Sequence, residues 1–254
     1  MPPPLPHLLT TPDPSGLNFF AALPAPVLER MDGLKEVRSF ADGAWIYHQD
    51  QVVEGVFQLA EGEWKVMHTD ARGYQQVLAF LRPGAVTGII PFFEGRPSGI
   101  GVRSLRRSRG FYIPGESIRR WALTEPAGVD AVMRYFGAGV RHLMDVAHGL
   151  SLLTVPERLA KVLLTEQQRR PDSPLLEFRE DQGELGLHMG CTRAAVSRAF
   201  KLLADMGLIR NTFPVVKLLD LPTLQRMAGS RPASAAPPRI ARSRALVEVA
   251  RHPS

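Results

Sequence analysis

The side chains best suited to chemistry in this sequence lie in the segment GCTRAAVSRAFK, residues 190–201. If the segment is helical, its spacing places Arg193, Ala194, Ser197 and Arg198 on one face. An arginine can donate two hydrogen bonds to one guanine, and a serine can contact a base or a phosphate. This face therefore predicts a recognition helix that reads base edges in the major groove of DNA. The alternative is a basic helix face that only contacts solvent.

Four further residues are placed to contact the DNA backbone. Thr192 directly precedes the predicted helix, and Lys201 lies on its cationic face. Arg210 and Lys217 belong to the short apolar runs LIR and VVKLL, which flank the turn NTFP as in a β-wing. Contacts to phosphates fix the register of a protein on DNA without reading its sequence.

The elements that must present these side chains are predicted by residues 181–209. Gly186 is placed where two helices approach closely, and Gly190 follows where the chain must turn with positive φ. Thr192 is then expected to cap the second helix, and Val196 returns to the core side. The pattern Gly-x₃-Gly-x₅-Val, with apolar residues at the other inward positions, is typical of a helix-turn-helix.

The region before this motif has the pattern of apolar runs and turns that is typical of an all-β domain. From Gly33 to about Ile113, short apolar runs such as FQLA, EWKVM and GFYI alternate with Asp-Gly, Glu-Gly and Pro-Gly turns. Several short strands at spacings of roughly 8–12 residues favour a small sandwich or barrel. The arginines at 103, 106, 107 and 109 are expected in a solvated loop, and the alternative is a cluster that meets an anion.

A long helix is predicted between these two regions, over residues 126–152. Gly137 and Gly139 would weaken a solvated helix, so we expect another backbone to approach there. Apolar residues recur at alternating spacings of four and three, a heptad pattern that predicts a seam with a symmetry mate. The alternative is an amphipathic helix that lies on its own barrel. The seam residues are Val129, Met133, Phe136, Val140, Leu143, Ala147 and Leu150.

The remaining segments give weaker signals. Thr154 is a candidate N-cap of a helix that reaches about Arg170. Residues 1–17 are expected to form a disordered arm, because six prolines fall within the first 16 positions. Residues 229–254 form a basic tail for which disorder is expected; a short basic helix is the alternative.

Composition and charge support a DNA partner and exclude several other classes. The chain has 254 residues and a net charge of +6, and residues 155–254 carry all of the excess, with 16 Lys and Arg against 10 Asp and Glu. Such asymmetry suggests a polyanion partner for the basic half. The single cysteine, Cys191, excludes an intrachain disulfide and a four-cysteine cluster. No apolar run reaches 18 residues and the N-terminus does not resemble a secretory signal, so we expect a cytoplasmic protein without membrane contact.

Together these features resemble the Crp/Fnr family of bacterial transcription regulators, over about residues 18–228. The resemblance implies an α+β protein in three parts: a double-stranded β-helix barrel of the cyclic-nucleotide-binding type at 18–125, a dimerisation helix at 126–152, and a winged helix-turn-helix at 153–228. It also implies a homodimer that binds a palindromic promoter site and contacts RNA polymerase. The segments that carry the resemblance are ADGAWIYHQD (41–50), VFQLAEGEWKV (56–66), LRPGAVTG (81–88) and GCTRAAVSR (190–198).

The same resemblance shows where an effector would bind and why cyclic AMP is not expected. In cyclic-nucleotide members a Gly-Glu pair holds the ribose and an Arg-Ser pair holds the phosphate, which a guanidinium can pair with directly. Here Gly88 is followed by Ile89, and the later element has a proline between Arg96 and Ser98.

The long helix departs from the family pattern as well. Leu143 and Met144 occupy the place of the polar pair that would meet the base. At the other end of the chain, Ala194 stands where many relatives carry a glutamate, so the operator should differ from the common family half-site at that base pair.

Other sensing chemistries have little support in the residues. An oxygen-sensing cluster requires several cysteines, and no spacing singles out His48, His68, His142 or His148 as a haem ligand. No nucleophile–base pair or metal-binding motif is present either, so we expect neither an enzyme nor a metal or other cofactor. The alternative function is a signalling module whose barrel binds a small ligand or a protein, with the helix-turn-helix serving only for packing.

Overall fold

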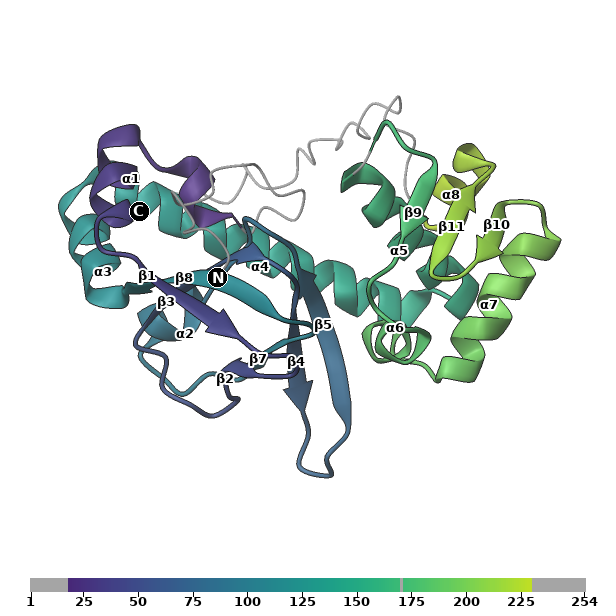
Figure 1. Ribbon diagram of the computed structural model, residues 1–254, viewed down its shortest axis with the longest axis horizontal. Helices are drawn as coiled ribbons and strands as arrows, with labels where there is room; N and C mark the ends of the chain where they lie inside the picture. The colour runs from purple at the N-terminus through teal and green to yellow at the C-terminus, as the bar shows by residue number, and fades with distance from the viewer. Residues whose placement is uncertain (1–17, 170, 230–254) are drawn as a thin grey trace, which may run out of the picture.

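The computed structural model describes residues 18–169 and 171–229; the predicted arm at 1–17 and all but the first residue of the predicted tail lie outside this range. The chain forms two lobes, a β-barrel and a smaller C-terminal unit, and α4 (Pro126–Leu152) runs from one to the other (Figure 1). The predicted α+β class is confirmed. Within the described residues, no helix is both long and apolar enough to cross a membrane.

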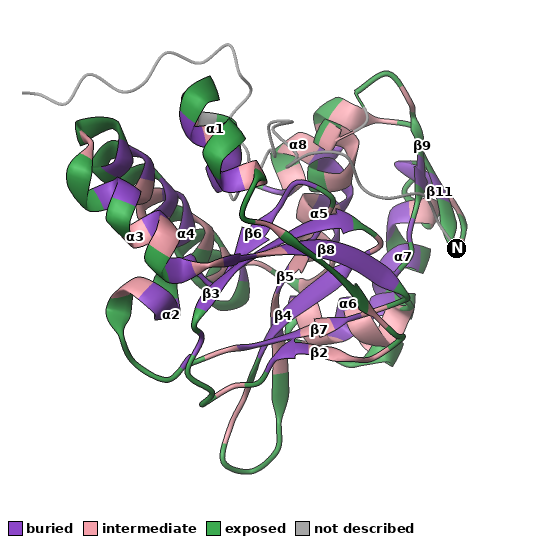
Figure 2. Ribbon diagram, turned by 60° about the vertical axis from the view of Figure 1, so that its left-hand side comes forward, coloured by how far each residue is buried: buried purple, intermediate pink, exposed green. Residues whose placement is uncertain are grey.

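The barrel consists of two four-stranded antiparallel sheets, in the orders β1-β8-β3-β6 and β2-β7-β4-β5. Their inner faces bury Leu59, Trp64 and Phe111, and strands β3, β4 and β8 are almost wholly buried (Figure 2). The strands are β1 (Glu36–Phe40), β2 (Trp45–Tyr47), β3 (Gly55–Glu61), β4 (Trp64–Thr69), β5 (Gln75–Leu81), β6 (Val86–Thr87), β7 (Gly101–Ser104) and β8 (Ser108–Pro114).

Short helices precede and follow the strands of the barrel, and another lies within their sequence. The flanking helices are η1 (Phe19–Ala22), α1 (Ala25–Asp32) and α3 (Gly115–Thr124), and α2 (Ile89–Glu94) lies between β6 and β7. Phe19 and Phe20 are buried, and the ring of Phe19 packs edge-on against Trp121 and Tyr135. The first turn of helix therefore ties the N-terminal segment to α3 and α4 by apolar burial.

The arginine cluster between β7 and β8 is more engaged than expected. Arg109 is buried and forms an ion pair with Glu61, and Arg103 donates from Nε to the carbonyl of Gly43 at 2.5 Å. Arg106 donates to the carbonyl of Arg179 in the C-terminal lobe at 2.9 Å, although both Arg106 and Arg107 are exposed. The prediction of a solvated loop therefore holds for Arg106 and Arg107. It was wrong for half-buried Arg103 and buried Arg109, because their partners lie far away in the sequence.

Helix α4 packs one of its faces against its own barrel. Ala131, Tyr135 and Ala138 are buried there, and the Tyr135 hydroxyl donates to the carbonyl of Val86 at 2.7 Å. A backbone approaches closely at Gly128, where a Cβ would stand 2.5 Å from the Cα of Ala122.

The expectation that a backbone approaches at Gly137 and Gly139 is not met within this chain. A Cβ on Gly139 would touch only the side chain of Ile90 at 3.4 Å, and one on Gly137 only that of Arg141 at 3.6 Å. Small residues on this part of α4 accommodate side chains of the same chain.

The C-terminal lobe surrounds a second core that includes Leu159, Leu163, Val196 and Phe200. Its sheet has the order β10-β11-β9, so the predicted two-stranded wing gains a third strand that sequence reasoning missed. The elements are α5 (Val155–Arg169), β9 (Leu175–Glu177), α6 (Gln182–Met189), α7 (Arg193–Asp205), β10 (Ile209–Thr212), β11 (Val215–Leu218) and α8 (Leu221–Met227).

The start of α5 shows a variation on the expected cap. The Glu157 carboxylate accepts hydrogen bonds from both the backbone N–H and the hydroxyl of Thr154, each at 2.7 Å. These bonds hold the pKa of Glu157 below its ordinary value. Thr154 therefore donates to the first turn here, where an N-cap side chain would accept.

Candidate nucleic-acid interface and effector sites

The helix-turn-helix is built from α6, a tight turn and α7, and local chemistry fixes its geometry. The Asp181 carboxylate accepts from the backbone N–H of Glu184 at 2.8 Å, which caps α6. Gly190 ends α6 with φ +61°, and a Cβ on Gly186 would stand 2.7 Å from the carbonyl oxygen of Cys191. The Thr192 hydroxyl accepts from the N–H of Ala195 at 3.2 Å and caps α7. The predicted motif is confirmed.

Helix α7 separates its apolar and cationic residues cleanly. Val196, Phe200 and Leu203 are fully buried in the lobe's core. The opposite face is exposed, and its cationic side chains form no ion pair with any described residue. The structure thus brings together on one open face the predicted DNA-reading residues and Lys201; they are Arg193, Ala194, Ser197, Arg198 and Lys201.

The wing brings the two other predicted backbone contacts side by side. Arg210 on β10 is the register partner of Lys217 on β11, and both are exposed. Val216 and Leu218 on β11 point to the core, so the alternation along this strand places Lys217 outward. Two cationic side chains on neighbouring strands form a second basic surface on the same lobe.

The predicted seam of α4 is largely open in the single chain. Val129, Met133, Val140 and Leu143 are 53%, 63%, 56% and 51% exposed, and Ala147 and Leu150 are exposed as well. Phe136 differs, because it packs partly against the barrel core. One face of the helix therefore covers the barrel, as in the second interpretation. The face that carries the predicted seam has no partner in this chain, and the seam stays a prediction.

The predicted effector residues do not form one enclosed pocket within the chain. Gly88 has φ +92° and begins α2, whereas Ile89 is completely buried. Ser98 is also buried, and its hydroxyl donates to the carbonyl of Ile100 at 2.8 Å. Arg96 is exposed to solvent.

The barrel interior next to Gly88 is occupied by side chains. The hydroxyl groups of Tyr47 and Thr87 share a hydrogen bond, with 2.6 Å between their oxygens. Burial raises the pKa of Tyr47 to about 12. Leu143 and Met144, which would meet a base, are 51% and 67% exposed on the open face of α4. Within the described residues, no group of three or more His, Cys, Asp or Glu side chains could hold a metal ion.

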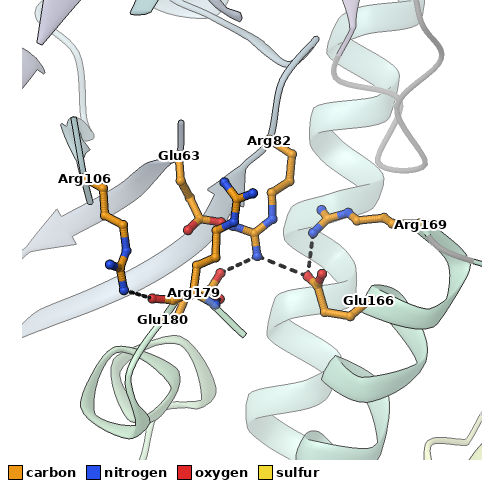
Figure 3. A network of polar contacts seen from close by, with 7 residues as sticks. All are labelled: Glu63, Arg82, Arg106, Glu166, Arg169, Arg179 and Glu180. Atoms are coloured by element: carbon orange, nitrogen blue, oxygen red, sulfur yellow. Dashed lines mark hydrogen bonds and ion pairs between the residues drawn. The ribbon is translucent and has the colours of Figure 1, made fainter. Parts of the chain in front are cut away.

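A polar network that the sequence did not predict joins the two lobes (Figure 3). Arg82, just after β5, pairs with Glu63 of the barrel, with Glu180 at 2.5 Å, and with Glu166 of α5 at 3.4 Å. The Glu63 and Glu180 side chains are each only 1% exposed. The guanidinium of Arg82 therefore neutralises buried carboxylates from both lobes.

Two further contacts extend this connection. Lys65 on β4 donates to the Glu184 carboxylate on α6 at 2.7 Å. Gln76 on β5 donates from its amide nitrogen to the carbonyls of Leu187 and His188 at the end of α6, at 2.6 and 3.0 Å. The β4–β5 hairpin of the barrel thus holds the first helix of the DNA-binding motif.

A β-barrel, a long helix with an open apolar face and a winged helix-turn-helix in one chain define a two-domain DNA-binding regulator. Family models support this class in both lobes: residues 37–125 match the cyclic nucleotide-binding domain, and residues 157–227 match the Crp-like helix-turn-helix domain. The chain belongs to the Crp/Fnr family of transcription regulators.

Curated relatives are regulators of the same kind. The transcriptional regulatory protein Btr of Bordetella pertussis is 26% identical over 212 residues, which cover 82% of this chain and 87% of that protein. The cAMP-activated global transcriptional regulator CRP of Salmonella typhimurium is 25% identical and covers 72% of this chain and 90% of its own length.

Solved structures share the fold. FixK2 from Bradyrhizobium japonicum matches with a TM-score of 0.71 at 21% identity, over 79% of this chain and 99% of that one. A CooA mutant from Carboxydothermus hydrogenoformans matches with a TM-score of 0.65 at 18% identity, over 77% and 88% of the two chains.

Proposed function

We propose that this regulator acts as a homodimer that binds a two-fold symmetric promoter site through α7 and the wing. The observation that carries the proposal is the exposed face of α7, where Arg193, Arg198 and Lys201 lie without carboxylate partners among the described residues. A face that served only for packing would be buried or neutralised, so the alternative of a purely ligand-binding module is disfavoured.

Each side chain of this face has an expected role. Arg193 and Arg198 can each donate two hydrogen bonds to a guanine, and Ser197 can contact a neighbouring base. Ala194 offers no acceptor for a cytosine amino group, although its methyl group suits the apolar edge of thymine. Thr192, Lys201, Arg210 and Lys217 are proposed to contact phosphates.

The dimer is proposed to form along α4. Met133, Val140 and Leu143 lie on its open face, and burying such a stripe against a symmetry mate would remove apolar surface from water. Two helix-turn-helix units on a two-fold axis imply half-sites about 34–36 Å apart. RNA polymerase beside the bound promoter is a further proposed partner, and the cytoplasm is the proposed compartment.

We do not expect cyclic AMP to be the effector. Buried Ile89 supplies no carboxylate for a ribose, and Arg96 is exposed whereas Ser98 is buried. Calorimetry should therefore detect no micromolar binding of cyclic AMP; if binding is found, Arg96→Ala and Ser98→Ala would locate it.

The proposed function is tested by selecting bound sites from random duplex DNA with the full chain. We expect an inverted repeat, and affinity for it should fall steeply with salt because phosphate contacts release counterions. Arg193→Ala with Arg198→Ala should abolish the enrichment, whereas Arg72→Ala, on the exposed β4–β5 turn, should not. Recovery of no common sequence with the unmodified chain would contradict the proposal.

A further inference from the structure

A cavity of about 270 Å³ lies where the two lobes meet, and it is separate from both the barrel interior and the DNA-binding face. Its walls come from β5 of the barrel, from α4, and from α5 and α6 of the C-terminal lobe. Elements of both lobes therefore line one cavity.

Much of the wall is apolar and aromatic. Phe80 of β5 and Phe178 of the C-terminal lobe line it, together with Val162, Leu185 and Met189. The ring of His188 lies 5.2 Å from the ring of Phe80, measured between centroids, and adds another flat surface. Such a lining suits a flat apolar ligand.

One cation in the wall has no carboxylate partner. Lys161 pairs with Asp145 at 3.7 Å, and Arg169 pairs with Glu166 at 2.6 Å. Arg158 forms no ion pair with a described residue, and its buried Nε finds no hydrogen-bond acceptor among them. Its Nη1 donates to the carbonyl of Met189. The side chain as a whole is half-buried and lines the cavity, so its charge can pair with an anionic ligand there.

The volume limits the size of a ligand. A cavity of about 150 Å³ holds one benzene ring, so 270 Å³ suits one ring with a substituent or two fused rings. We propose that this cavity binds a small aromatic carboxylate, with the carboxylate on Arg158 and the ring against Phe80 and Phe178.

Because the site lies between the lobes, a bound ligand is expected to affect DNA binding. This expectation rests on the proposed function. A ligand there contacts both lobes at once, so it favours the arrangement of lobes that forms the cavity. Binding of the ligand itself does not depend on DNA and can be measured on the free protein.

The chain offers matched variants on both sides of the cavity. Arg158→Gln removes the charge, and Arg158→Lys keeps it. Gly149 lines the cavity and is buried, and a Cβ there would meet no heavy atom within 4 Å. Gly149→Leu should therefore fill the space, while Gly149→Ala leaves most of it open and favours the helix.

The test is calorimetry on the full chain without DNA, using benzoate, indole-3-carboxylate and 1-naphthoate, with 1-naphthamide as the neutral analogue. At least one carboxylate should bind. Arg158→Gln should weaken its binding about tenfold or more, and Arg158→Lys should restore part of the affinity. Gly149→Leu should abolish binding and Gly149→Ala should retain it, with thermal melting showing that each variant is folded.

Three results would overturn the proposal: no binding of any of the three carboxylates at millimolar concentration, equal affinity in the Arg158→Gln variant, or undiminished affinity in the folded Gly149→Leu variant. A protein that bound naphthoate yet selected no DNA would contradict the proposed function and leave this site standing. Selective DNA binding without any carboxylate binding would contradict this site and leave the proposed function standing.

Discussion

Arginine side chains have two different roles in this molecule, and their partners distinguish them. Arg82 and Arg109 pair with carboxylates and are mostly buried, so their charge is used within the fold. Arg193 and Arg198 are exposed and form no ion pair with described residues. A guanidinium that is already paired has few free N–H donors for DNA, whereas an unpaired one on a recognition helix can donate to a base.

Arg198→Ala should therefore weaken binding to the selected site by about 1–3 kcal/mol and relax the preference at one guanine. Competition binding with single-base variants of the site measures both effects. If affinity and preference were unchanged, α7 would not lie in the major groove.

Lys201→Ala should behave differently, because a phosphate contact carries no sequence information. Affinity should fall about equally for all sequences, and the slope of log affinity against log salt should decrease by roughly 1. Titrations at four or more salt concentrations measure this slope. A change confined to one base pair would mean that Lys201 reads a base instead.

His188 makes folding stability depend on pH. Burial lowers its pKa from the usual 6.5 to about 4, with His142 and Arg169 adding to the shift while Val77 and Glu180 oppose it. Between these two values the unfolded chain binds a proton that the folded chain does not. The free energy of unfolding should therefore fall as the pH falls from 6.5 to 4, by about 3 kcal/mol at about 1.4 kcal/mol per pKa unit.

His188→Gln removes this titration while it keeps a polar side chain. The difference in unfolding free energy between the two proteins should change by that amount across pH 6.5 to 4, as measured by denaturant titration. Carboxylates that titrate in the same range contribute equally to both proteins, so their contributions cancel in the difference. A difference that stays constant with pH would show that the imidazole is not buried in the folded state.

At the scale of the elements, α4 is defined by its two faces. Ala131, Tyr135 and Ala138 cover the barrel, and the heptad stripe that includes Met133 and Leu143 is open. A stripe of that length is unfavourable in water, so a second helix along it would gain stability from burial.

The double variant Met133→Glu/Leu143→Glu should be monomeric in sedimentation velocity, because a dimer would bury unpaired carboxylates. Affinity for the two-fold site should collapse with it. Both positions are more than half exposed in the single chain, so the fold itself should persist, whereas Phe136→Glu would also disturb the barrel.

Arg141→Glu is the matched control for this variant. It changes the net charge by the same amount on an exposed position of α4 outside the seam, and it should stay dimeric. A dimeric double variant would show that the copies associate through another surface.

The elements that sequence could predict are those with local determinants. Gly186, Gly190 and Val196 act within one motif, and the heptad of α4 repeats within one helix, so spacing was enough to predict them. The partner of Arg82 could not be predicted in the same way. Glu180 lies 98 residues further along the chain, and nothing in the sequence distinguishes it from other glutamates. The third wing strand, β9, has only three residues, too few for a clear alternation.

At the scale of the whole molecule, the lobes are joined by buried charge as well as by α4. Glu63 of the barrel and Glu180 of the C-terminal lobe share the Arg82 guanidinium, and each carboxylate is 1% exposed. Removing one member of such a network leaves the other charges buried and unpaired. The resulting loss of folding stability is larger than the net stability that the intact network contributes. The Arg82 network is therefore one of several contacts that orient the DNA-binding lobe, together with the bonds from Lys65 and Gln76.

Arg82→Met should lower the free energy of unfolding by about 3–5 kcal/mol at pH 7. The cost arises because Glu63 and Glu180 would then be buried without the cation that they share.

Arg72→Met provides the surface counterpart. Arg72 pairs with Asp70 at 2.9 Å, but its side chain is 78% exposed, so its loss should cost less than about 1 kcal/mol. Denaturant titrations of both variants at pH 7 separate the two cases. If Arg82→Met were as mild as Arg72→Met, the two glutamates would have another source of compensation. The lobes would then be oriented by the apolar contacts around Phe80 and by the bonds from Gln76 to the end of α6.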